Sequence, residues 1–415
     1  MSLINKKIVS FSIFLYLTLI AGFFYGESLN GGAYGDWVGA YLNPIEDFSI
    51  NFYETLTNYD KYGNRHSPIY LIFLSSFLRI DLSMEVIRLI HLHLSIPLIL
   101  IFYKCLELKF ENTKKAYLSL LSLIIFLSPT FRSLSIWPDS RLPGLLFFTI
   151  TIFFYLKFEQ TRLEKFMWLT SLFLIITSYI SPNFSLFFIY FFYDIFKKIS
   201  IPKIFLFFLF NFLLSIPILF YIFIMDVNFL ISGQTPSLSN QSLAFSYNFA
   251  NKILIISSII FFHLMPVFFY KKNFINFYIF FKKQIIILFL FSIFLIYFFN
   301  YQISFTGGGL FFYLSNYIFE NNYFFYIISF ISLSFVLYLS KLDVKNFYFF
   351  LVLILTNIQN TIYHKYYEPL LLIIFFTLLK SAHAELIVND KKSIYSFYSV
   401  SILFIVMQIY KNYII

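Results

Sequence analysis

Long apolar runs separated by short polar segments occupy most of the chain. The runs are about 14–22 residues long, near the ~20 residues that a helix needs to cross a bilayer, and lack the ~10-residue alternation of membrane barrel strands. Because backbone in hydrocarbon must satisfy its own hydrogen bonds, the pattern predicts an all-α, polytopic transmembrane helix bundle. We expect about thirteen spans, over 8–24, 84–103, 116–130, 142–157, 167–180, 183–196, 204–225, 253–270, 284–300, 322–340, 347–362, 367–380 and 394–410.

A polar stretch follows the first predicted span. Residues 26–67 gather acidic and basic side chains among aromatic ones, and the apolar stretch 68–78 after them is too short to span a bilayer. We expect 68–78 to form a juxtamembrane helix in the interface. The chain is therefore predicted to be one transmembrane domain, 1–415, with a long loop at 25–83 that carries the chemistry and with the remaining transmembrane helices in 84–410.

Composition and charge agree with membrane residence. Hydrophobic residues make up 60% of the chain and charged residues only 12%, whereas a soluble domain has about 25% charged residues. The net charge of +10 would suggest a nucleic-acid partner in a soluble protein, but here Lys and Arg form small clusters between apolar runs. Positive-inside topology explains the clusters, so we expect a lipid bilayer and no nucleic acid as partner.

The charge clusters predict a cytoplasmic N-terminus and extracytoplasmic loops at 25–83, 131–141, 226–252, 301–321 and 363–366. The first run lacks an A-x-A-like cleavage site, so we expect an uncleaved span. Ser181-Pro182-Asn183 predicts a tight hairpin turn, and the alternative is one kinked helix over 167–196. The single cysteine, Cys105, excludes an intramolecular disulfide and a multi-Cys zinc site.

Asp36 is the first candidate for chemistry. It follows the glycine-rich run 31–35, precedes Trp37, and has Tyr41 five residues later. Glycines allow close backbone approach to a ligand, and a carboxylate beside aromatic rings could act as a general base or help to hold a divalent cation. The alternative is an ordinary solvated loop acid.

Two further segments carry charge on predicted outer loops. Arg65 and His66 precede Pro68, where the start of the interfacial helix favours anions such as a lipid phosphate; the alternative is a helix cap with two headgroup contacts. In the hairpin 128–141, Arg132 and Arg141 could bind phosphate through forked hydrogen bonds. A structural pair between Asp139 and Arg141 is the alternative there.

A late polar patch, 357–369, includes His364, Lys365 and Tyr367. Amide, hydroxyl and aromatic groups at the end of a membrane helix predict a sugar-binding surface, and the alternative is an aromatic belt. His91 and His93, within the second predicted span, are expected to bond neighbouring helices rather than a metal, and His263 is expected to be a satisfied core histidine. No H-E-x-x-H, G-x-S-x-G or Cys/His cluster occurs, so we assign no residues to a metal.

The first 160 residues resemble the GT-C superfamily of membrane glycosyltransferases, including protein mannosyltransferases and aminoarabinose transferases. The resemblance lies in Gly35-Asp36-Trp37 with Tyr41, in His66-Ser67-Pro68-Ile69-Tyr70, in Arg88 at the second span, and in Asp139 as a second acidic position. The acidic pair of that superfamily is here Asp36 with Trp37, and its Pro-Pro is Ser67-Pro68, which leaves the use of a divalent cation open.

The resemblance implies an inverting hexosyl- or pentosyltransferase. It would move a sugar from a polyprenyl-phosphate donor to a glycan or lipid acceptor on the extracytoplasmic face, with Asp36 as general base. Basic residues of the two segments described above would meet the donor phosphate. Two other functions stay open: an O-antigen-type polysaccharide polymerase, and a lipid-linked glycan flippase or transporter. The expected location is a bacterial cytoplasmic membrane.

Overall fold

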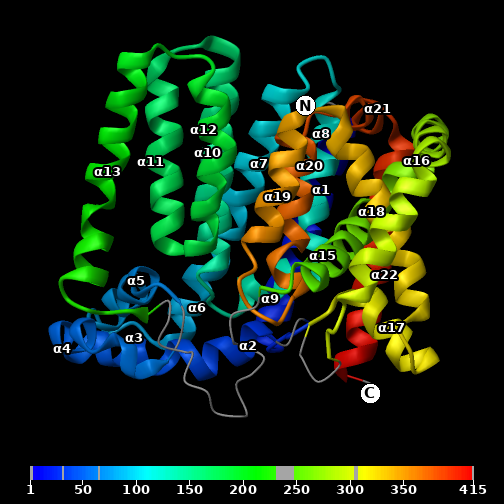
Figure 1. Cartoon of the computed structure of the whole chain (residues 1–415). Coiled ribbons are helices and arrows are strands. Elements are labelled where there is room, and N and C mark those ends of the chain that lie inside the picture. Colours follow the sequence, from blue (N-terminus) through cyan, green and yellow to red (C-terminus); the bar gives the residue numbers. More distant parts are fainter. Residues whose placement is uncertain (1–2, 30–31, 64–65, 230–246, 303–306, 414–415) are drawn as a thin grey trace. The chain divides into compact units, whose positions relative to one another are not determined.

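The described residues form helices and contain no β-strand, which confirms the predicted all-α class (Figure 1). The computed structural model describes residues 3–29, 32–63, 66–229, 247–302 and 307–413. They divide into two compact units, 1–235 with 401–415 and 236–400.

The first unit begins with one long helix and a loop of short helices, followed by a set of longer helices. Its elements are α1 (Leu3–Phe24), α2 (Gly32–Asp36), the π-helical turn η1 (Trp37–Tyr41), α3 (Leu42–Ile50), α4 (Phe52–Thr57), η2 (Tyr59–Tyr62), α5 (Pro68–Leu78), α6 (Met84–His93), α7 (Ser95–Lys109), α8 (Lys115–Leu123), η3 (Ile124–Leu127), α9 (Pro129–Ile136), α10 (Arg141–Thr161), α11 (Glu164–Ile180), η4 (Pro182–Phe187), α12 (Phe188–Phe196) and α13 (Ile201–Phe223).

Serine followed by proline starts two of these helices. The Ser67 hydroxyl accepts the N–H of Ile69 at the start of α5, and the Ser128 hydroxyl accepts the N–H of Phe131 at the start of α9. Serine is a favoured N-cap, and proline at the first helical position lacks only an N–H that has no partner inside the helix. The expected helix over 68–78 is thus present with those bounds.

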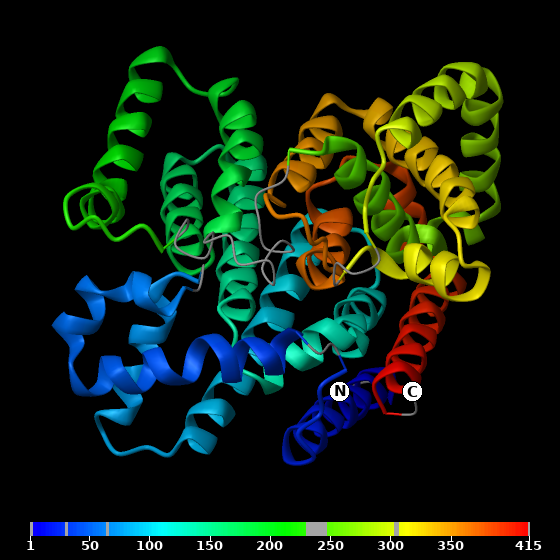
Figure 2. The same ribbon diagram turned by 60° about the horizontal axis from the view of Figure 1, so that its bottom comes forward.

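Helices α10 to α13 stand side by side, and α3 to α5 of the first loop lie across one of their ends (Figures 1 and 2). The Tyr221 hydroxyl near the end of α13 donates to the Leu56 carbonyl oxygen of α4, 2.9 Å away, and so ties the loop to this end. The sequence Ser181-Pro182-Asn183 separates α11 from the following helical segment, so 167–196 forms two helices and not one.

The second unit consists of α15 (Phe249–Leu264), η6 (Met265–Phe269), α16 (Lys271–Tyr297), α17 (Gly309–Phe319), α18 (Tyr323–Leu342), α19 (Val344–Leu355), η7 (His364–Tyr366), α20 (Glu368–Thr377), α21 (Ala382–Val388) and the first part of α22 (Lys391–Tyr413). Within it, α18 packs against α15, α16, α17 and α19.

Eight helical segments within the described residues are long and apolar enough to cross a membrane, and a ninth is added if a bent pair counts as one span. The bent pair joins 115–127 to α9 at an angle of 68°. The expected count of about thirteen is not confirmed. Segments 183–196, 347–362 and 367–380 contain helices of only nine, twelve and ten residues, well below the ~20 that a span requires.

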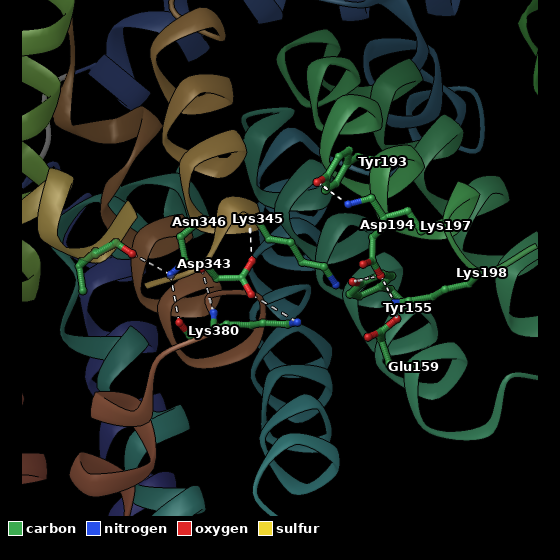
Figure 3. A network of polar contacts seen from close by, with 11 residues as sticks. Tyr155, Glu159, Tyr193, Asp194, Lys197, Lys198, Asp343, Lys345, Asn346 and Lys380 are labelled. Carbon is green, nitrogen blue, oxygen red and sulfur yellow. Dashed lines mark hydrogen bonds and ion pairs between the residues drawn. The ribbon is translucent and has the colours of Figure 1, made fainter. Parts of the chain in front are cut away.

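Lysines at helix ends make ion pairs with acidic side chains of their own unit (Figure 3). In the first unit, Lys198 binds both Asp194 and Glu159, and the Tyr155 hydroxyl donates to Asp194 over 2.7 Å. In the second unit, Asp343 accepts the N–H of Lys345 over 2.7 Å and lies 3.5 Å from the Lys380 ammonium. These contacts fasten neighbouring helices to one another within each unit.

Candidate functional site

Two carboxylates share one guanidinium at the start of α10. The Arg141 Nη2 atom lies 3.2 Å from Asp36 Oδ2, and its Nη1 atom lies 3.2 Å from Asp139 Oδ2. Asp139 also accepts the Arg141 backbone N–H over 2.8 Å, which suits a carboxylate at a helix N-terminus. The Asp139 side chain is fully buried, whereas that of Asp36 is 28% exposed. Asp139 therefore fixes Arg141, and Arg141 in turn orients the more accessible acid.

The π-helical turn η1 sets the directions of Asp36 and Tyr41. Asp36 immediately precedes this turn and Tyr41 ends it, five residues later. In an α-helix, residues five apart point about 140° away from each other. The wider π-helical turn closes a hydrogen bond from i to i+5 and brings them back toward one direction. A local feature of the backbone thus places the acid and the phenol on the same side.

Tyr41 joins the first loop to the start of α10. Its hydroxyl oxygen accepts the Ser140 backbone N–H over 3.0 Å, lies 3.1 Å from the Ser140 hydroxyl, and lies 2.9 Å from Nδ1 of His66. Burial is the main cause that raises the pKa of Tyr41 well above its usual value, with a further increase from Asp139 and an opposing effect of Arg141. The phenol therefore stays protonated and acts as a hydrogen-bonding link.

His66 is held from a second direction. The Tyr59 hydroxyl donates to the His66 carbonyl oxygen over 3.0 Å, and His66 directly precedes the Ser67 cap of α5. The position of α5 is fixed in turn by His91 on α6. The Nε2 atom of His91 donates to the Leu134 carbonyl oxygen over 2.7 Å, so its Nδ1 atom accepts from the Tyr70 hydroxyl. His91 thus links α5, α6 and α9, as expected for a histidine that bonds neighbouring helices.

Arg132, predicted as a phosphate contact, makes a buried bidentate pair with Glu27. Its Nε and Nη2 atoms donate to the two Glu27 carboxylate oxygens over 2.7 and 2.6 Å, and Nη1 and Nη2 donate to Thr18 over 3.1 and 3.0 Å. A Cβ atom on Gly22 would lie 2.5 Å from Glu27 Oε2, so a larger residue at this position would displace the carboxylate from its place beside Arg132. The structure therefore places the Arg132 guanidinium in a joint between α1 and α9.

His364, Lys365 and Tyr367 belong to the second unit and contact residues of that unit. The Leu310 backbone N–H donates to Nε2 of His364 over 2.9 Å, and Nδ1 of His364 lies 3.2 Å from Nε2 of His263. Lys365 is buried, and the Tyr367 hydroxyl lies 3.5 Å from the Leu353 carbonyl oxygen. Arg65 lies outside the described residues.

Sequence analysis missed two groups, Glu27 and the environment of Arg88. Glu27 belongs to no motif, and its partner lies 105 positions away. Arg88 was noted only as part of a family resemblance, but its guanidinium packs against the Trp137 ring. An unpaired acid directly after the first span is the one signal that could have pointed to the Glu27 contact.

No group of three or more His, Cys, Asp or Glu side chains within the described residues is arranged so that it could hold a metal ion. Asp36 and Asp139 are bridged by the Arg141 guanidinium, which supplies the positive charge that a divalent cation would otherwise bring.

No protein-family model, curated protein or solved structure matches this chain. The chemistry of the site therefore has to be argued from its residues. Asp36, Tyr41, His66, Asp139 and Arg141 form one connected group in the first unit, with a partly exposed carboxylate, a fixed guanidinium and an imidazole.

Proposed function

We propose that this chain is an integral membrane glycosyltransferase. It moves a sugar from a polyprenyl-phosphate-linked donor to a lipid-linked or surface glycan acceptor. The site faces the extracytoplasmic side of a bacterial cytoplasmic membrane, and the N-terminus lies in the cytoplasm. The long apolar helices support a membrane location, and the absence of a soluble nucleotide motif in the sequence favours a lipid-linked donor.

The observation that carries the proposal is the meeting of two distant segments. Asp36 from the first loop and the pair Asp139 and Arg141, about one hundred residues later, share one ion-paired group. Charged groups beside membrane helices are costly to bury and commonly mark functional sites. A hydrogen-bonded His66 in the same group adds a second polar side chain next to the partly exposed acid.

Asp36 is the general base in this proposal because its side chain is the more accessible of the two acids. The acceptor hydroxyl oxygen attacks C1 of the sugar, and the hydroxyl proton passes to Asp36. The bond between C1 and the phosphate oxygen breaks, and polyprenyl phosphate leaves with the bonding electrons. Arg141 keeps the carboxylate oriented, and Asp139 keeps Arg141 in place.

Release of polyprenyl monophosphate tests the proposal, because that product is the same for every sugar and acceptor. The purified full chain in lipid nanodiscs receives hexose- and pentose-bearing polyprenyl phosphates together with a lipid extract of bacterial membranes. We expect Asp36→Asn to lower the release rate by about 10²- to 10⁴-fold, the usual contribution of a general base. Glu46→Gln is the matched control, because Glu46 is an exposed acid of the same loop.

Two results would contradict the proposal at different levels. Release at the wild-type rate by Asp36→Asn would remove Asp36 from the role of base. No release by the wild-type chain with any of these donors would contradict the transferase function itself.

A further inference from the structure

The guanidinium of Arg88 lies between two aromatic rings. Its Cζ atom is 3.8 Å from the centre of the Trp137 ring and 4.9 Å from that of Phe23. The Trp137 ring is fixed on its other edge, since its Nε1 atom donates to the Glu27 carbonyl oxygen over 2.9 Å. Rings from α1 and from the segment after α9 thus hold the planar cation of α6 in one orientation.

One edge of this guanidinium has no hydrogen-bond partner in the part of the chain that the structure describes. The Nε and Nη2 atoms of Arg88 are buried, and within the described residues neither donates to any oxygen. A buried polar group without a hydrogen-bond partner destabilises the folded chain, and a charged one does so more strongly. Buried polar groups in proteins are nearly always paired, so an unfilled charged edge calls for a specific explanation.

The same edge of a second arginine, Arg132, has a partner in this structure. Its Nε and Nη2 atoms donate side by side to the two oxygens of the Glu27 carboxylate. These two nitrogens form the forked edge that suits carboxylate and phosphate oxygens. Glu27 is already paired with Arg132, and Glu85, one turn before Arg88, is exposed and forms no ion pair with Arg88 among the described residues. The described part of the chain therefore supplies an oxyanion to Arg132 and none to the equivalent edge of Arg88.

We propose that the Nε and Nη2 edge of Arg88 binds a phosphate group carried by a lipid. The helices that hold Arg88 also present apolar side chains to their surroundings, for example Phe24 of α1, 76% exposed, and Val86 of α6, 40% exposed. A lipid tail suits such a surface, and the guanidinium would take the phosphate. Phosphate binding at Arg88 depends on the geometry of this side chain and not on the reaction that the chain catalyses.

Tryptophan fluorescence gives a direct binding assay, because Trp137 contacts Arg88. The chain has three tryptophans, so Trp37→Phe with Trp168→Phe leaves Trp137 as the only reporter. The full chain in uncharged detergent is titrated with farnesyl phosphate, inorganic phosphate and phosphatidylglycerol, and farnesol serves as the uncharged control. We expect saturable changes with farnesyl phosphate and none with farnesol. A response to inorganic phosphate as well would show that the phosphate alone suffices, and one to phosphatidylglycerol would show that a phospholipid headgroup also binds.

Arg88→Met carries the decisive comparison. Methionine keeps an unbranched apolar stem and removes the unsatisfied charge, so we expect unchanged or higher thermal stability together with at least a tenfold weaker Kd. Arg88→Lys should also bind more weakly, because an ammonium cannot offer the fork. Arg79→Gln, at an exposed arginine at the end of α5, should leave binding unchanged. Equal affinity of Arg88→Met and wild type, or no response of the wild-type chain to any phosphate probe, would overturn the proposal.

Discussion

Replacing Glu27 by alanine tests how much the joint between α1 and α9 stabilises the first unit. The substitution removes two of the four hydrogen bonds that the Arg132 guanidinium makes with described residues. The arginine left behind has a side chain that is only 8% exposed. A hydrogen bond to a charged group contributes about 1.5–3 kcal/mol, and breaking a buried pair costs about 3–5 kcal/mol. Because the Glu27 side chain is 17% exposed and admits some water, we expect a loss of about 3 kcal/mol in the free energy of unfolding.

The measurement is unfolding of the full chain by SDS in mixed micelles, for Glu27→Ala, Arg132→Ala and the double variant. The two sites are in contact, so the double variant should lose less than the sum of the single losses, with a coupling of about 2–3 kcal/mol. Glu164→Ala is the matched control. Glu164 pairs with Lys203, both side chains are nearly half exposed, and such a pair contributes about 0–1 kcal/mol.

Gly22→Ala approaches the same joint without removing a charge. Its Cβ atom would lie 2.5 Å from Glu27 Oε2, so the variant should destabilise the wild-type chain and have little further effect beside Glu27→Ala. Equal losses for Glu27→Ala and Glu164→Ala would refute the reasoning, because they would show that water reaches Arg132 as freely as it reaches a surface pair.

Two further predictions concern hydrogen bonds and pH. Tyr41→Phe removes the oxygen that accepts the buried Ser140 N–H and should cost about 1–3 kcal/mol in the same SDS titration; an unchanged midpoint would contradict the link. Burial lowers the pKa of His383 below its usual value of 6.5, so the unfolded chain binds more protons than the folded one as the pH falls. The contribution of His383 to stability is therefore complete above about pH 6.5 and declines below it, and the melting temperature should fall toward pH 5.5 less in His383→Gln than in wild type; equal slopes would contradict the prediction.

Local signals in the sequence predicted the helical class and some boundaries. Apolar runs identified the membrane helices, and the Ser67-Pro68 pair marked the start of α5 with its observed bounds. Asp36, Asp139 and Arg141 were each selected as candidates by residue type and position, and the structure brings them into contact. The start of α5 depends on neighbouring residues alone. The three charged residues could be selected because charged side chains are rare in an apolar chain.

Pairings between distant residues could not be read from the sequence. No local pattern links Glu27 to Arg132, so sequence analysis assigned Arg132 to a bound phosphate. In the structure its guanidinium binds the Glu27 carboxylate instead. The count of about thirteen spans is not confirmed, because apolar runs such as 347–362 and 367–380 have the composition of a membrane span and also that of a short buried helix. The late residues His364 and Lys365 have their contacts in the second unit, and apolarity alone does not reveal which unit a run belongs to.

The short helix α9 also has a consequence for biosynthesis. All eight of its residues are buried, including Arg132, so it offers no face to lipid and is too short to enter a bilayer alone. Glu27 leaves the ribosome 105 residues before Arg132, and α1 precedes both. The acid that neutralises the arginine is therefore already made when α9 is synthesised. The order of residues along the chain thus lets Arg132 pair with Glu27 during membrane insertion, before the later helices are synthesised.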